Sequence, residues 1–228
     1  MIYAIGDLHL GSQVEKPMSV FGCNWEKHPD NIRASWLENV NDNDAVLIPG
    51  DISWGMTLEE SYPDLDWIDQ LPGRKYLIKG NHDYWWKSIK RMNHFSETMY
   101  FIQNNYFAYG DIAICGTRGW ICPDTQDFSP QDQKIYQREA HRLHLSLEAA
   151  QKAGFDQIIG MIHFPPANEK KEPSLFTQLF EHYHVKQVVY GHIHGKDSFL
   201  SGSLGNINGV DYQLVSCDYL DFKLFKLK

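Results

Sequence analysis

The stretch KYLIKGNHD, residues 75–83, joins an apolar run to a polar cluster. The run from Lys75 to Ile78 predicts a β-strand, and Gly80-Asn81-His82-Asp83 follows it closely. An apolar run without polar alternation is typical of a strand that is buried on both faces. Ligands of open α/β sheets bind beyond the carboxyl ends of the strands, so this cluster marks a candidate site.

The same pattern of apolar runs extends over the rest of the chain. Further strands are expected at Ile2–Ile5, Ala45–Ile48, Ile112–Cys115, Ile158–Ile162 and Gln187–Tyr190. Helical patterns cover Asp30–Val40, Tyr84–Met92 and Asp132–Ala153, and the closing strands are expected at Ser198–Leu200, Asp211–Val215 and Phe222–Phe225. Two sheets packed face to face and flanked by helices satisfy this α/β order. Because no linker or repeat divides the chain, we expect one domain over residues 1–228.

Polar clusters follow five of the expected strands, where side chains from different strands can converge. The candidate metal ligands are Asp7, His9, Asp51, Asn81, His163, His192 and His194. Asp7 and His9 are two residues apart, and so are His192 and His194. Residues with this spacing point the same way at an extended strand end, so each pair can bind one ion.

Seven such side chains exceed the ligand set of one tetrahedral ion. They suit two divalent ions that share a bridging carboxylate, roughly 3.5–4 Å apart. Carboxylate oxygen and imidazole nitrogen accept Mn, Fe, Zn or Ni, and we favour Mn. Two such ions, two carboxylates and a bridging hydroxide leave about one positive charge, which attracts a phosphate anion.

Five sequence blocks, taken in order, resemble the calcineurin-like metallophosphoesterases over residues 6–195. The blocks are Asp7-Leu8-His9, Gly50-Asp51, Gly80-Asn81-His82-Asp83, His163-Phe164-Pro165 and Gly191-His192-Ile193-His194. The resemblance implies a four-layer α-β-β-α sandwich with two mixed β-sheets packed face to face and flanking helices. It also implies that Asp7, His9 and His194 hold one metal, that Asn81, His163 and His192 hold the other, and that Asp51 bridges them.

The resemblance further implies a catalytic role for His82, as a general acid hydrogen-bonded to Asp83 that protonates the leaving oxygen. A nearby imidazolium removes the penalty of expelling an alkoxide. Many relatives continue the second block as Gly-Asp-x-x-Asp-Arg-Gly, whereas this chain reads GDISWG at residues 50–55. The phosphate-binding arginine of the protein phosphatases is therefore missing at that place, which argues against phosphoproteins as substrates.

Four residues outside these blocks are candidates for substrate binding: Arg118, Trp54, Trp25 and His28. Arg118 follows an expected strand, and its planar guanidinium fits a phosphate, although an ordinary loop arginine fits the pattern equally well. Trp54 could stack on a nucleobase or pack in the core. Trp25 and His28 lie in a long loop after the first strand, together with Phe21, and loops beside a rigid site often carry specificity.

The composition limits the possible partners. The formal net charge of -8 argues against a long nucleic acid or an anionic membrane as partner. No apolar stretch reaches the ~18 residues of a membrane span, no basic leader precedes Asp7, and the four cysteines form no C-x-x-C pair. We therefore expect a cytoplasmic enzyme that hydrolyses a phosphate monoester or diester in a small soluble substrate. A metal-dependent nuclease and a non-catalytic protein-binding scaffold are the alternatives; the substrate and the oligomeric state stay open.

Overall fold

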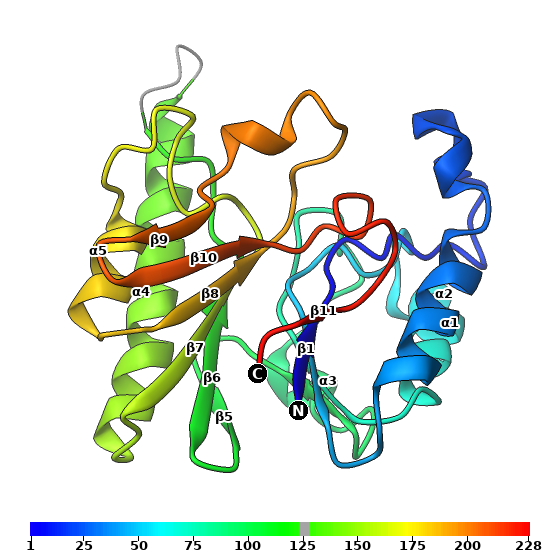
Figure 1. Cartoon of the computed structure of the whole chain (residues 1–228), viewed down its shortest axis with the longest axis horizontal. Helices are drawn as coiled ribbons and strands as arrows, with labels where there is room; N and C mark the ends of the chain where they lie inside the picture. Colours follow the sequence, from blue (N-terminus) through cyan, green and yellow to red (C-terminus); the bar gives the residue numbers. More distant parts are fainter. Residues whose placement is uncertain (124–127) are drawn as a thin grey trace.

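Two mixed β-sheets form the middle of the molecule (Figure 1). The computed structural model describes residues 1–123 and 128–228. The first sheet has the order β11-β1-β2-β3-β4, with β1 (Ile2–Ala4), β2 (Ala45–Ile48), β3 (Arg74–Leu77), β4 (Met99–Phe101) and β11 (Phe225–Lys226). The second has the order β5-β6-β7-β8-β10-β9, with β5 (Tyr106–Tyr109), β6 (Ile112–Thr117), β7 (Gln157–Ile162), β8 (Gln187–Tyr190), β9 (Gly205–Ile207) and β10 (Val210–Leu214).

Strand direction explains why the sheets are mixed. β1 to β4 are parallel to one another, and β11 joins β1 in the antiparallel sense. In the second sheet β6, β7, β8 and β10 are parallel, while β5 and β9 are antiparallel edge strands. The parallel strands of each sheet therefore end at a common edge, where the loops that follow them meet.

Helices cover the outer faces of the two sheets (Figure 1). The first sheet is covered by α1 (His28–Asn39), α2 (Leu58–Asp69) and the single turn α3 (Ile89–Met92). The second is covered by α4 (Pro130–Lys152) and α5 (Leu175–His182). Short 3-10 helices lie at η1 (Met18–Phe21), η2 (Cys23–Trp25) and η3 (Phe199–Ser201). The four-layer α-β-β-α sandwich implied by the sequence motifs is confirmed.

Successive residues of one strand pack into different layers, because strand side chains alternate between the two faces. In β1, Ile2 and Ala4 enter the core shared by the two sheets, whereas Tyr3 packs toward the helices. In β6, Ile114 faces the shared core and Cys115 faces α4. Both faces are thus buried, which accounts for the apolar runs without alternation.

Three expected elements differ from the structure. The helix expected at Tyr84–Met92 is reduced to Ile89–Met92, because the chain first turns around the buried Asp83 carboxylate. Ser198–Leu200 contributes to a 3-10 helix and not to a strand. The last strand begins only at Phe225, since Phe222 has a φ of 57° that an extended strand does not allow.

Two helices, α2 and α5, were not expected, although each begins with a capping box. Thr57 and Glu60 cap α2 reciprocally, and Ser174 and Thr177 do the same for α5. In the described part of the chain no helix is long and apolar enough to cross a bilayer. All four cysteines are free thiols.

Candidate metal centre

The seven predicted ligands converge at the carboxyl ends of β1, β2, β3, β7 and β8. Two compact groups stand out, in each of which the ligand atoms lie within 4.8 Å of one another. The first group is Asp7, His9 and His194, and the second is Asp51, His163 and His192. The Nε2 atoms of His9 and His194 are 3.2 Å apart, so two ring nitrogens face one another in the first group.

Asn81 completes the second group, and Asp51 connects the two groups. The Oδ1 atom of Asn81 lies 2.7 Å from His163 Nε2 and 2.9 Å from His192 Nδ1, which adds the amide oxygen to the second group. The Oδ2 atom of Asp51 lies 3.5 Å from His163 Nε2 and 3.8 Å from His9 Nε2. One carboxylate oxygen thus lies between both groups, as a bridging ligand requires.

Four of the seven residues have a left-handed backbone, which non-glycine residues rarely adopt. The φ angles are 56° at Asp7, 44° at His9, 49° at Asp51 and 72° at His192. Asp7 and His9 therefore point into one site because of a tight turn beyond β1, not because of the strand alternation that their spacing suggested. Such conformations cluster where the surrounding structure holds functional groups in place.

Two glycines leave room for the carboxylates. A Cβ atom on Gly80 would overlap the side chain of Asp51, and a Cβ atom on Gly191 would overlap that of Asp7. Both carboxylates also accept backbone N–H groups: Asp51 Oδ1 from His82 at 2.8 Å, and Asp7 from His192 at 3.0 Å. The glycines therefore fix where the two acidic groups lie.

The pKa shifts of four of the ligands fit bound cations. Burial raises the pKa of Asp7 to about 7, and it also raises the pKa of Asp51. Burial lowers the pKa of His163 to about 3 and that of His192 to about 2, so both rings are neutral at neutral pH. Neutral imidazoles offer lone pairs, and buried carboxylates call for positive charge. Divalent cations would satisfy both at once.

Asp218 is a site residue that the sequence motifs did not reveal. Its Oδ1 atom lies 3.0 Å from His194 Nδ1, and its Oδ2 atom accepts the Gly195 N–H at 3.0 Å. Burial lowers the pKa of His194, but the hydrogen bond to Asp218 and the charge of Asp7 outweigh this and raise it to about 9. A carboxylate in this position orients a histidine ring so that its other nitrogen faces the metal.

Asp83 does not have the surroundings that were expected for a partner of His82. Its buried carboxylate accepts backbone N–H groups of Ile52 at 2.9 Å and Gly80 at 2.7 Å, and the Trp85 indole N–H at 3.0 Å. Among the described residues, no hydrogen bond joins Asp83 to the His82 ring. The expected pair is corrected accordingly: Asp83 ties the loop after β2 to the loop after β3.

His82 lies at the rim of the metal centre. Its ring is half-buried, 4.5 Å from Trp54 and 5.9 Å from His9 between ring centroids. Trp54 also stacks on His9, with centroids 4.8 Å apart. Trp54 therefore borders the site and also packs against the adjoining core. That it stacks on a nucleobase stays a prediction.

Trp25 and His28 line a cavity of about 890 Å³ that His9 borders. Trp25 packs edge-on against His194, with centroids 5.7 Å apart. Both ring nitrogens of His28 are occupied, by the backbone oxygens of Trp25 at 2.9 Å and Leu8 at 3.0 Å. His28 therefore supports the loop and has no free ring nitrogen for a substrate. Phe21 is exposed and does not line this cavity.

Arg118 lies on the other side of the centre, after β6. Its guanidinium contacts Glu139 at 3.4 Å and lies 4.6 Å from the ring centroid of Trp120. Its backbone oxygen accepts the His163 N–H at 3.1 Å, which links this loop to the second ligand group.

Comparisons with known proteins bear on the same region. The family model described as calcineurin-like phosphoesterase matches residues 1–196. The gene 66 protein of Mycobacterium phage L5 is 39% identical over 77 residues, 34% of this chain and 37% of that protein. The gene 66 protein of Mycobacterium phage D29 is 37% identical over 83 residues, 36% of this chain and 40% of that protein. The matched region thus spans about two fifths of the length of these curated relatives.

A solved structure shares the fold of the whole chain. The crystal structure of a protein of unknown function from Aquifex aeolicus superimposes with a TM-score of 0.53. The match covers 99% of this chain and 94% of the other, at 16% sequence identity. At that identity the likeness concerns the fold alone.

Proposed function

The chain belongs to the calcineurin-like phosphoesterase family, and from this premise we propose that it hydrolyses a phosphate monoester or diester in a small soluble substrate. The family and the two His/Asp groups support a metal-dependent hydrolase. The observation that carries the proposal is the position of Asp51, whose Oδ2 atom lies within 4 Å of a histidine nitrogen of each group. Such a shared carboxylate is the expected ligand between two cations.

The proposed cofactors are two divalent cations, with Mn favoured. Asp7, His9 and His194 would hold one, Asn81, His163 and His192 would hold the other, and Asp51 would contact both. Bound cations of this kind supply a Lewis acid for the phosphate and lower the pKa of a coordinated water to about 7. Asp218 would keep the His194 ring in the orientation that presents Nε2 to the first cation.

His82 is proposed as the general acid. The Asp51 carboxylate accepts the His82 backbone N–H at 2.8 Å, which fixes this residue relative to the bridging group. The ring is held against Trp54 while remaining partly exposed, so a protonated imidazole can meet a leaving oxygen at the rim. Donating a proton there spares the release of an unstable alkoxide and accelerates such reactions by roughly 10²–10⁴-fold.

The cavity beside His9 supports an organic substrate of moderate size. Its volume of about 890 Å³ lies within the range of small-molecule sites, roughly 300–1,000 Å³. Trp25, Trp67 and Met18 give it apolar walls, which suit the organic part of a phosphate ester. The reduced cysteines agree with our further proposal of a cytoplasmic location.

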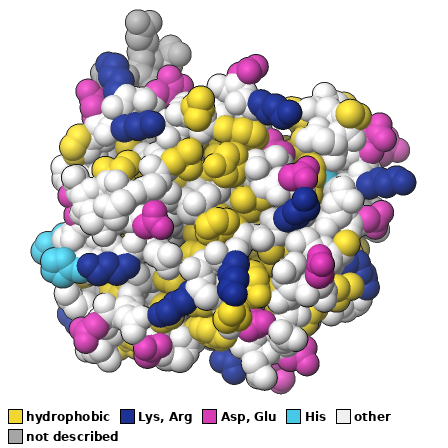
Figure 2. Space-filling view, in the orientation of Figure 1, with side chains coloured by type: hydrophobic (Ala, Val, Ile, Leu, Met, Phe, Trp, Pro, Cys, Tyr) yellow, Lys and Arg dark blue, Asp and Glu magenta, His cyan; other side chains and the backbone are white. Residues whose placement is uncertain are grey.

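A nuclease is the less favoured alternative. Figure 2 shows basic and acidic side chains interspersed on one face of the molecule, and the chain as a whole carries a net charge of -8. Neither feature favours a polyanionic duplex. A non-catalytic scaffold is disfavoured too, because every position of the expected ligand set is filled.

A substrate screen with the Mn-loaded protein tests the proposal. p-Nitrophenyl phosphate and bis-p-nitrophenyl phosphate separate monoester from diester hydrolysis, and a nucleotide panel and labelled DNA extend the range. We expect turnover of at least one small ester, its loss in Asp51→Asn, and intact DNA. Degradation of DNA alone would favour the nuclease, and no turnover at all with verified metal content would favour the scaffold.

A further inference from the structure

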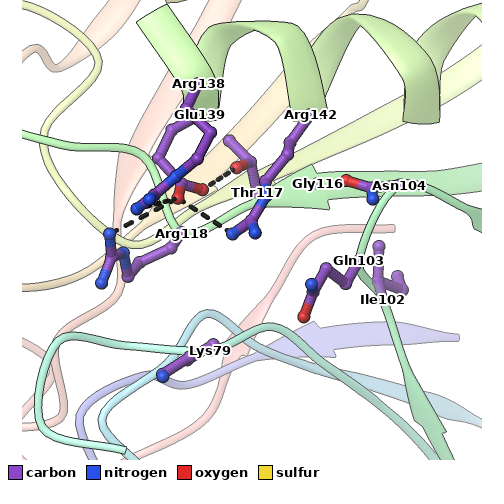
Figure 3. Close-up of a pocket in the computed structure, with 10 residues that line it drawn as sticks. All are labelled: Lys79, Ile102, Gln103, Asn104, Gly116, Thr117, Arg118, Arg138, Glu139 and Arg142. Atoms are coloured by element: carbon purple, nitrogen blue, oxygen red, sulfur yellow. Dashed lines mark hydrogen bonds and ion pairs between the residues drawn. The ribbon is translucent and has the colours of Figure 1, made fainter. Parts of the chain in front are cut away.

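A second cavity, of about 220 Å³, lies at the carboxyl ends of β3, β4 and β6 and is closed by α4 (Figure 3). Its charged lining consists of Lys79, Arg118, Arg138, Arg142 and Glu139. Four cations therefore face one carboxylate, which leaves a surplus of three positive charges. In a chain whose net charge is -8, this concentration of positive charge is a local exception.

Glu139 organises the arginines. Its side chain is 1% exposed, and its Oε1 atom lies 3.0 Å from Arg142, 3.4 Å from Arg118 and 3.5 Å from Arg138. Its other oxygen accepts the Thr117 hydroxyl at 2.9 Å. A single carboxylate thus holds three guanidinium groups side by side without neutralising them, and each keeps further N–H groups for another acceptor.

Two of the cations have donors that the protein does not use. The Arg118 Nε atom is buried and has no hydrogen-bond partner among the described residues. Lys79 is half-buried, lies across the cavity from the arginines in Figure 3, and makes no hydrogen bond or ion pair within the described chain. A bound anion would compensate both groups.

The cavity adjoins the metal centre through two short links. Lys79 is separated from the ligand Asn81 only by Gly80. The Arg118 backbone oxygen accepts the N–H of the ligand His163 at 3.1 Å, so the loop that carries Arg118 is fixed beside the second ligand group. The second cavity and the second ligand group are therefore neighbours in the structure.

Building on the proposed function, we propose that this cavity is a second anion site, which binds a phosphate or carboxylate group of the substrate other than the one that is hydrolysed. Arg142 and Lys79 supply charge from opposite walls, and Arg118 adds charge from the loop beside the second ligand group. The preferred substrates would then carry two anionic groups. Guanidinium groups suit this task because they donate paired N–H groups to phosphate and carboxylate oxygens.

Calorimetric titration of the Mn-loaded protein tests this site without requiring turnover. The first probe is methylphosphonate, which has one anionic group. The others are alkylene bisphosphonates, whose two phosphonate groups are separated by one to four methylene groups. The measured quantity is the ratio of the methylphosphonate Kd to the Kd of the best bisphosphonate. We expect a ratio of at least about 10 in the wild type, because linking two binding groups raises affinity. Arg142→Gln and Lys79→Met should each reduce it severalfold.

Arg33→Gln, which removes an exposed arginine of α1, is the matched control and should keep the wild-type ratio. If methylphosphonate binds but the wild-type ratio is no more than about 2, the value expected from counting two equivalent ends, the second site is refuted while the proposed function stands. If methylphosphonate does not bind, the proposed function fails and the second site with it. Inorganic phosphate is titrated in parallel. If one equivalent of it binds at a separate site, is lost in Arg142→Gln, and no bisphosphonate binds more tightly than methylphosphonate, the cavity holds a free ion and the proposal is overturned.

Discussion

Replacing Asp83 by Asn tests whether this carboxylate holds the loops that carry the predicted ligands. Its Oδ1 atom accepts from the Ile52 N–H and the Trp85 indole, and its Oδ2 atom accepts from the Gly80 N–H at 2.7 Å. An asparagine retains one of the two acceptors. Its amide NH₂ must then face at least one buried N–H, which loses its partner.

The size of the effect follows from these contacts. A hydrogen bond to a charged group contributes roughly 1.5–3 kcal/mol, and an unmet buried donor costs roughly 1–3 kcal/mol. The substitution also has a favourable part. Burial and the charge of Asp51 raise the pKa of Asp83 to about 7, which shows that a negative charge is disfavoured there, and the neutral asparagine removes this charge. We therefore expect a loss of about 2–3 kcal/mol of unfolding free energy, near the lower end of the summed range. For a domain of this size the melting temperature falls by roughly 2–4 °C per kcal/mol, or about 5–10 °C.

Thermal unfolding followed by calorimetry measures the melting temperature of Asp83→Asn, with Asp221→Asn as the control. Asp221 is 82% exposed and has a φ of 52°, which asparagine tolerates, so its replacement should leave the melting temperature within about 2 °C. A melting temperature of Asp83→Asn equal to that of the wild type, together with a shifted pH–rate profile, would refute the structural role. It would point instead to an interaction with His82.

Three further substitutions have distinct expected outcomes. His82→Ala should keep both metals and lose roughly 10²–10⁴-fold in turnover of an ester with a poor leaving group, as seen in steady-state kinetics; loss of metal would contradict the general-acid role. Asp218→Asn should weaken metal binding roughly 10–100-fold in a competition titration, whereas an unchanged affinity would show that His194 is oriented by other contacts. Burial raises the pKa of Cys115 to about 12 in the folded protein, whereas a thiol in the unfolded chain titrates at about 8.5. The buried neutral thiol therefore stabilises the fold fully below about pH 8.5, and this stabilisation is lost as the pH rises toward 12. Cys115→Ala should therefore remove up to about 1.4 kcal/mol per pH unit from the alkaline slope of unfolding free energy, and an unaltered slope would disprove this assignment.

The sequence predicts the layers and the ligand clusters well because both depend on local patterns. Strands buried on both faces leave apolar runs, and each run that ends in a polar cluster identifies a loop at the same edge. Asp218 could have been found by the same reasoning, since Ser216-Cys217-Asp218 follows the strand expected at Asp211–Val215. The capping boxes at Thr57 and Ser174 were likewise available as signals for α2 and α5.

Other features depend on contacts that no local pattern reveals. The partners of Asp83 include Ile52, which is 31 residues away, whereas its neighbour in sequence, His82, is not a partner. The ring of His28 is engaged by Leu8, 20 residues earlier, so its availability to a substrate could not be judged from the loop alone. The second cavity likewise combines Lys79 with Arg118, which follows β6, and with two arginines of α4.

Anomalous diffraction from a crystal grown with excess Mn²⁺, recorded on both sides of the manganese absorption edge, tests the central claim most directly. The account predicts two peaks roughly 3.5–4 Å apart, with Asp51 contacting both and His194 and His163 on opposite sides. A single peak at full Mn²⁺ saturation, or two peaks of which only one contacts Asp51, would contradict it.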